Sequence, residues 1–203
     1  MDEQIRAVDY AFINALGTIS AAIGATPSIT LPEEIKNGLD VVGNALQATG
    51  NGLDANISEG LDAVGGTMQS FGNGLVIYGD IAAQPQHDNL RTTTIGNVLQ
   101  ALGGSLSLQS DLETEERNRA TALSIIGNLL QIAGNSLQAV STILQINQAA
   151  DEAKTDQVNA TGSWVQATGA SLSFLAAYDR ATTIPFESRD TGHFIPSSAS
   201  LMD

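Results

Sequence analysis

Two histidines, His87 and His193, are the only side chains that could act as an imidazole base or as a nitrogen ligand for a metal. Asp88 follows His87, but no second histidine stands at helical spacing from it, as a metal site on a helix would need. The sequence contains no cysteine, which excludes a thiol nucleophile, a thiolate metal site and a disulfide. Both histidines fall in stretches that we interpret as loop or tail, so we predict no metal site.

Acidic residues concentrate at 111–116, where carboxylates could chelate a cation. Arg117 and Arg119 follow directly, and no glycine stands where a calcium loop needs one, so a solvated turn is the better interpretation. No serine lies in a Gly-x-Ser-x-Gly elbow after a strand, and no Gly-Lys-Ser/Thr phosphate loop is present. We therefore predict a protein without catalytic residues, cofactor or small-molecule substrate, which is not an enzyme.

Glycines recur at a spacing of seven residues. Five such pairs begin a similar segment: Gly43 and Gly50, Gly65 and Gly72, Gly96 and Gly103, Gly127 and Gly134, and Gly162 and Gly169. Gly17 and Gly24 form a weaker sixth pair, and Gly79 follows Gly72 at the same spacing. Seven residues are almost two helical turns, so the members of a pair lie on one stripe of a helix. Glycine costs about 1 kcal/mol relative to alanine inside a helix, and close approach of a second helix can offset that cost. We predict that the ten glycines of the first five pairs are helix-packing residues.

A large apolar residue stands three positions after the first glycine of most pairs, as Leu46, Leu99 and Leu130 do. This placement is typical of a helix–helix seam. Glutamine follows at the next position, as at Gln47 and Gln100, and we expect it to point away from the seam.

The periodicity predicts helices at 3–24, 34–54, 58–82, 88–111, 115–148 and 152–178. Pro32 is placed to open the second helix, and Pro85 breaks the chain before the fourth. The junctions near 113 and 150 contain no proline, so both short hairpins and long continuous rods stay open there. The predicted fold class is all-α: a bundle or elongated array of five to six mainly antiparallel helices with glycine-heptad packing.

The repeat pattern stops after Tyr178, which divides the chain into a helical repeat domain, 1–178, and an extended C-terminal tail, 179–203. The tail carries two apolar-proline clusters that could dock on a neighbouring molecule. We predict four docking residues there: Ile184, Phe186, Phe194 and Ile195.

The formal charge of −14 comes from 22 acidic and 8 basic residues. Such a charge repels nucleic acid and disfavours anionic lipid. Charge gathers between long uncharged runs such as 92–110 and 120–150, as if it marked helix ends. We predict a structural protein that self-assembles into a filament, sheet or coat layer of identical subunits, with the tail linking them.

Because the sequence opens with an acidic Met1-Asp2-Glu3, we expect no signal peptide. The compartment is then either the cytoplasm or a surface that the protein reaches by a non-classical route.

A membrane-active or pore-forming helical protein is the alternative. The uncharged runs 10–32 and 157–178 are long enough to span a bilayer, and small-residue stripes are typical of membrane helices. Against this alternative, every repeat carries Asn or Gln about once per turn, which hydrocarbon penalises. The mean hydropathy of +0.03 is also that of a soluble protein.

The Gly-Asn-x-Leu-Gln-Ala-x-Gly cadence, as at 43–50 and 96–103, resembles an uncharacterised group of glycine/glutamine heptad-repeat proteins of Bacillus-type bacteria. The resemblance covers roughly residues 38–175 and excludes the tail. It implies a repetitive protein and brings no activity or site residues with it.

Overall fold

The computed structural model describes residues 3–82 and 85–183, and within these ranges it consists of six α-helices and no strand. Their bounds are α1 Glu3–Ala25, α2 Glu33–Ala55, α3 Gly60–Ile81, α4 Gln86–Glu113, α5 Arg119–Ile146 and α6 Glu152–Thr182. The prediction of an all-α bundle of antiparallel helices is confirmed. The helical part continues to Thr182, beyond the domain boundary predicted after residue 178, and the tail residues 184–203 lie outside the described ranges.

Short connections end each helix, including the two junctions that the sequence left open. Asn118 caps α5 by accepting a hydrogen bond from the Thr121 backbone N–H at 2.9 Å, and Asp151 caps α6 in the same way from Lys154 at 2.8 Å. Between α5 and α6, Gln148 takes a left-handed conformation with φ of 50°, which cannot continue a helix. The chain therefore folds as hairpins at 113 and 150, and not as continuous rods.

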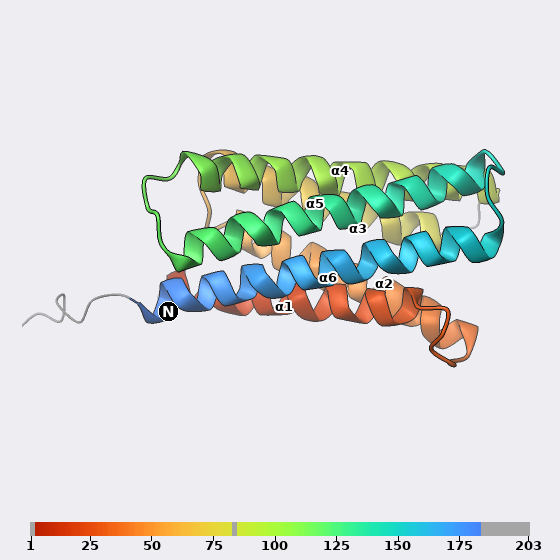
Figure 1. The fold of residues 1–203 in the computed structure, drawn as a ribbon, viewed down its shortest axis with the longest axis horizontal. Helices are drawn as coiled ribbons and strands as arrows, with labels where there is room; N and C mark the ends of the chain where they lie inside the picture. The colour runs from red at the N-terminus through yellow and green to blue at the C-terminus, as the bar shows by residue number, and fades with distance from the viewer. Residues whose placement is uncertain (1–2, 83–84, 184–203) are drawn as a thin grey trace, which may run out of the picture.

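The six helices form a closed ring, which we call the barrel (Figure 1). Each helix packs against its neighbours in the chain, and α1 also packs against α6. Among the described residues no other pair of helices packs backbone against backbone, so only side chains reach across the ring. The barrel consists of three hairpins, α1–α2, α3–α4 and α5–α6, set side by side.

Glycines line the contact inside each hairpin. In α3–α4 a Cβ atom built on Gly65 would lie 2.6 Å from the carbonyl oxygen of Gly103, and one on Gly72 would lie 2.6 Å from that of Gly96. In α5–α6 Gly134 and Gly162 face each other at 2.6 and 2.7 Å by the same measure. The helix backbones are thus in direct contact, at a separation that only glycine permits.

Burial in the barrel is reversed relative to an ordinary soluble domain. In residues 3–82 and 85–183 the buried apolar residues are ten alanines and Val76. Within the described ranges no Leu, Ile, Phe, Met or Trp is buried, whereas Gln47, Asn73 and Asn135 are among the largest side chains that are fully buried. The interior is therefore made of amides, hydroxyls and methyl groups.

The expectation that the repeat glutamines point away from the helix seam is wrong, since Gln69 and Gln100 lie against the glycines of the α3–α4 contact. The glutamines are buried at all five repeat positions: Gln47, Gln69, Gln100, Gln131 and Gln166. The reason lies in helix geometry, because at about 100° per residue the position four after a glycine lies about 40° to one side of the glycine stripe. The position three after it lies about 60° to the other side. The structure turns the glutamine side inward and leaves the residues on the leucine side, such as Leu46, Leu99 and Leu130, half-buried.

Candidate functional site

The axis of the barrel is the candidate site, because polar side chains converge on it from every helix. On α2 the inward stripe contains Asp40, Asn44, Gln47 and Asp54, and on α5 it contains Asn128 with Gln131, Asn135 and others. These residues recur in steps of three and four, which places them on one face of each helix.

Four of the inward glutamines join in a hydrogen-bonded group that we call the glutamine layer: Gln47, Gln100, Gln138 and Gln166. The Gln166 amide nitrogen donates to Gln47 Oε1 at 2.8 Å and lies 3.3 Å from Gln100 Oε1. The Gln138 amide nitrogen donates to Gln166 Oε1 at 2.8 Å. The layer thereby connects α2, α4, α5 and α6 across the middle of the barrel.

Cavities lie on the axis on both sides of this layer. The first chamber has a volume of about 330 Å³ and is lined by residues from all six helices, at the end of the barrel that holds the N-terminus (Figure 1). The second chamber has a volume of about 190 Å³ and is lined from α2 to α6 at the opposite end. On α4, Gln100 stands between Asn97 of the second chamber and Ser107 of the first. The same order holds on α6, where Gln166 stands between Asn159 and Ser173.

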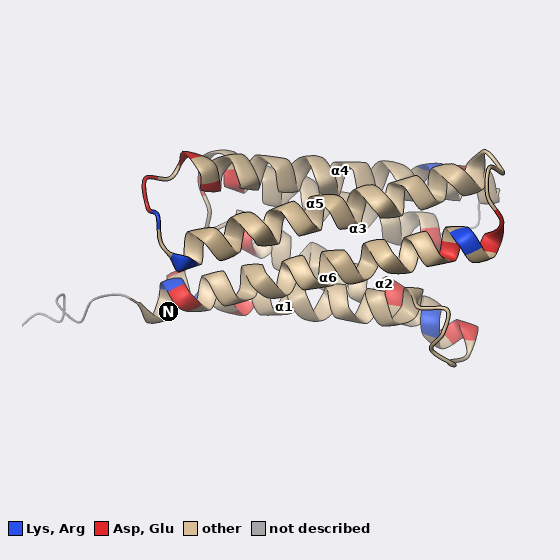
Figure 2. Ribbon diagram, in the orientation of Figure 1, with Lys and Arg blue, Asp and Glu red and all other residues tan. Residues whose placement is uncertain are grey.

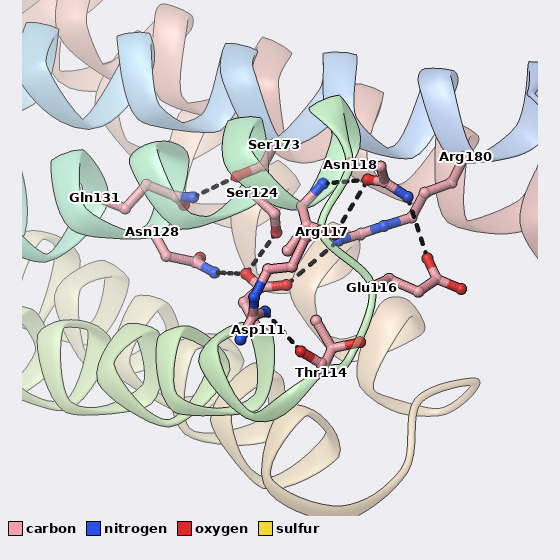
Figure 3. Close-up of polar contacts among 11 residues, drawn as sticks. Asp111, Thr114, Glu116, Arg117, Asn118, Ser124, Asn128, Gln131, Ser173 and Arg180 are labelled. Carbon is pink, nitrogen blue, oxygen red and sulfur yellow. Dashed lines mark hydrogen bonds and ion pairs between the residues drawn. The ribbon is translucent and has the colours of Figure 1, made fainter.

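Asp111 organises the wall of the first chamber (Figure 3). Its Oδ2 atom accepts hydrogen bonds from Ser124 Oγ at 2.6 Å and from Asn128 Nδ2 at 2.8 Å. Arg180 Nη2 lies 3.3 Å from its Oδ1 atom. One turn along α5 from Asn128, toward the middle of the barrel, the Gln131 amide nitrogen donates to Ser173 Oγ at 3.0 Å. One carboxylate therefore ties α4, α5 and α6 together at this mouth.

The carboxyls at the two mouths are harder to ionise than ordinary aspartates. Burial, together with the nearby charge of Asp62, raises the pKa of Asp54 to about 7, although Arg180 opposes the change. Burial also raises the pKa of Asp111, although Ser124 and Arg180 oppose the change.

Asp40 and Asp80 form an acidic pair at the second mouth. Withdrawal from water raises the pKa of both carboxyls, and the two share a hydrogen bond. The pair holds a proton more readily than two isolated aspartates would.

The outer surface of the barrel is apolar on every side. Twenty-one large apolar side chains among the described residues are exposed. Each helix contributes some of them, including Phe12 on α1, Val42 on α2, Phe71 on α3, Leu102 on α4, Leu129 on α5 and Trp164 on α6. Phe71 is 62% exposed and Trp164 is 42% exposed. We call this surface the outer belt.

Charge is sparse on the outer belt and concentrated toward the two ends of the barrel (Figure 2). The described charged residues lie within the first or last two turns of a helix or in a connection, except Asp40, which lines the second chamber, and Asp9 is exposed between the belt residues Ile5 and Phe12. On α2, Asp54 lines the first chamber and Asp40 lines the second, so neither carboxyl faces outward. The barrel thus has charged ends and an uncharged apolar waist.

Hydroxyl groups on the outer belt are satisfied by their own helix. Thr67 donates to the Ala63 carbonyl at 2.8 Å and Ser105 donates to the Ala101 carbonyl at 2.9 Å. Thr49, Ser136 and Thr168 make the same bond to the residue four positions back. These residues consequently need no water to complete their hydrogen bonds.

The ten predicted packing glycines all lie in helices and at close backbone contact. Gly65 and Gly72 face Gly103 and Gly96, and the α5–α6 hairpin repeats this antiparallel pairing with Gly127, Gly134, Gly162 and Gly169. Gly43 faces Gly17, and Gly50 lies against the backbone of Tyr10. The four predicted tail residues, Ile184, Phe186, Phe194 and Ile195, lie outside the described residues.

Sequence reasoning missed the axial glutamines, asparagines and aspartates. Their spacing of three and four residues was a usable signal, but the assumption that apolar residues face inward hid it. His87 is exposed at the start of α4, 3.7 Å from Asp88. In the part of the chain that the structure describes, no three His, Asp or Glu side chains group as metal ligands would.

Among the described helices, α1 alone is apolar enough along its length to cross a membrane by hydropathy, and it lies near the N-terminus. No curated protein and no solved structure matches the chain. The resemblance to Bacillus-type repeat proteins stays a prediction. A model of a family of unknown function, DUF6944, matches residues 10–174, which run from α1 to α6 and take in most of the barrel. The chain belongs to this DUF6944 family.

Proposed function

We propose that this protein is a membrane-embedded helical barrel, whose outer belt faces lipid and whose polar axis is shielded from it. The observation that carries the proposal is the reversed burial, with Gln47 and Asn135 fully buried while Phe71 and Trp164 are exposed. Soluble monomers rarely expose contiguous apolar surface of this extent. In hydrocarbon the same arrangement is favourable, because apolar side chains meet lipid and polar ones face the bundle interior.

The dimensions of the barrel support this proposal. The uncharged segments 63–79 of α3, 92–110 of α4 and 157–178 of α6 are about 26 to 33 Å long at 1.5 Å per residue. The hydrocarbon core of a bilayer is about 30 Å thick. The carboxyls of Asp40, Asp54, Asp80 and Asp111 lie outside these segments, at the mouths of the barrel.

The low overall hydropathy does not oppose a membrane location once the two faces of each helix are separated. A sliding average mixes an apolar outer face with an inner face of Asn, Gln and Ser, so helices such as α4 score near zero. Lipid contacts only the outer face. The Asn and Gln residues that count against a membrane protein in the sequence are buried in the barrel, as at Asn97 and Gln100.

Self-assembly into a sheet or filament is the second candidate, and the same outer belt favours it. A belt that is apolar on all six helices could pack against neighbouring copies on every side and leave the charged ends free. The two candidates differ in what covers the belt: lipid in the first and protein in the second.

Flotation with neutral phosphatidylcholine vesicles distinguishes them. We expect purified protein to float with the vesicles and to resist extraction with alkaline carbonate. Protein that stays in solution as a filament or sheet, with no bound lipid, would refute the membrane proposal and support assembly. A sharply monodisperse monomer that binds no vesicles would refute both.

A further inference from the structure

We propose that the axis of the barrel is a conduction path for small monovalent cations, which the glutamine layer closes in this structure. The inference rests on the proposed membrane location and names the solute class that the barrel would carry. It depends on three features: axial cavities at both ends, their acidic lining, and a hydrogen-bonded polar layer between them.

The path is already open over much of its length. The first chamber, about 330 Å³, reaches the end of the barrel beside Glu3 and Asp62. The second chamber, about 190 Å³, reaches the other end beside Asp80. What separates them is the level of Gln47, Gln100 and Gln166, where side chains meet across the axis.

The acidic side chains that line the path favour cations over anions, because those that are ionised carry negative charge. The first chamber is lined by four carboxylates, Glu3, Asp54, Asp62 and Asp111, and by one guanidinium, Arg180. The second chamber is lined by Asp40 and Asp80, with no Lys or Arg in its wall. Acidic rings of this kind raise the local concentration of cations and exclude anions.

Oxygen atoms suited to a partly dehydrated cation are present at the level of the layer. Asn73 and Asn135 are 0% and 1% exposed, and the Oδ1 atom of each accepts no hydrogen bond from the described protein. Asn73 lies on α3 between Gln69 and Val76, and Asn135 lies on α5 between Gln131 and Gln138. Buried carbonyl oxygens of this type can replace the hydration shell of Na⁺ or K⁺.

Gln166 holds the layer closed because it is the member that bonds to the other three. It donates toward Gln47 and Gln100 and accepts from Gln138. Each partner is itself anchored on a different helix, and the three hydrogen bonds described above all involve Gln166, so the loss of its amide removes all three. The helix positions need not move for the path to widen.

The test is potassium flux through neutral vesicles that contain purified wild-type protein, Gln166→Ala or a matched control. Gln157→Ala is the control, because Gln157 lies on the same helix but on the exposed outer face. We expect Gln166→Ala to raise potassium flux by about tenfold or more, as loss of one or two hydrogen bonds from a closing barrier would. Gln157→Ala should match the wild type.

Selectivity is measured as the reversal potential in a KCl gradient. Gln166→Ala should favour K⁺ over Cl⁻, and the added substitutions Asp54→Asn and Asp62→Asn should reduce that preference. Equal passage of K⁺ and Cl⁻ before the aspartates are changed would overturn the cation assignment.

The two proposals fail in different ways. Protein that does not float with vesicles refutes the membrane location. Protein that floats, with Gln166→Ala flux equal to that of the wild type, refutes the conduction path alone. Should circular dichroism show that Gln166→Ala is unfolded, Gln47→Ala, which removes a single bond of the layer, carries the same expectation of increased flux.

Discussion

A single methyl group added at Gly72 provides a sharp test of the hairpin packing. Gly72 of α3 faces Gly96 of α4, and a Cβ atom there would lie 2.6 Å from the Gly96 carbonyl oxygen. Ordinary contact begins at 3.4 Å, so the shortfall is 3.4 − 2.6 = 0.8 Å. Because the obstructing atom belongs to the backbone, Gly72→Ala must push the two helices apart.

Gly74 is the matched control, since it lies on the same helix and has no atom within 4 Å of a built Cβ. Gly74→Ala should stabilise the protein by up to about 1 kcal/mol through helix propensity. The same propensity gain applies at Gly72, but overpacking there costs about 1 to 3 kcal/mol. We therefore expect Gly72→Ala to be less stable than Gly74→Ala by about 1 to 3 kcal/mol, because the difference isolates the packing cost.

Chemical or thermal unfolding followed by far-ultraviolet circular dichroism measures this difference, in the detergent or buffer that keeps the protein monodisperse. Gly38→Ala on α2, which also has nothing within 4 Å, is a second control. The reasoning is refuted if Gly72→Ala stabilises the protein as much as the two controls do. That result would mean that the helices tolerate a Cβ at the contact.

Three further predictions concern other parts of the barrel. The Asp54 carboxyl has a pKa of about 7 in the folded protein, compared with an ordinary value of 3.8. Folding therefore takes up a proton between these pH values, and the free energy of unfolding should fall as the pH rises from about 4 to about 7. Unfolding titrations should show a shallower fall for Asp54→Asn, and an unchanged slope would contradict the burial of this group. Asn118→Ala removes the cap of α5 and should lower the free energy of unfolding by about 1 kcal/mol; no change in the unfolding midpoint would contradict the capping role. Phe71→Lys places a charge on the outer belt, where Phe71 is 62% exposed, and flotation should show weaker vesicle binding with the helix content retained; undiminished binding would place this face away from lipid.

The sequence was sufficient to predict the helices, because the glycine period and the charged junctions both follow helix length. Predicted and observed helices agree to within a few residues at most ends. The two largest differences are equal: the end of α6, predicted at 178 and observed at Thr182, and the start of α5, predicted at 115 and observed at Arg119. Asn118 explains the start of α5, since its cap and not the preceding acidic run fixes the first turn.

The orientation of the helices could not be predicted, because a heptad pattern with two candidate faces does not say which face is inside. Leu99 and Gln100 lie on opposite sides of the Gly96 stripe, and in water the apolar side would ordinarily be buried. Nor does the pattern specify ring closure, since the packing of α1 against α6 joins the two ends of the chain. The glutamine layer follows from both properties, and it could be recognised only after the ring was known.

Quenching of tryptophan fluorescence by brominated phosphatidylcholines tests the central claim most directly. The chain has one tryptophan, Trp164, which lies on the outer belt of α6 within the uncharged segment 157–178. A second reporter, Phe71→Trp combined with Trp164→Phe, probes α3 on another part of the ring. We predict that bromines deep in the acyl chains quench both reporters strongly. Unquenched emission from either one, in protein that retains its helices and is bound to the vesicles, would contradict a belt that faces lipid on all sides.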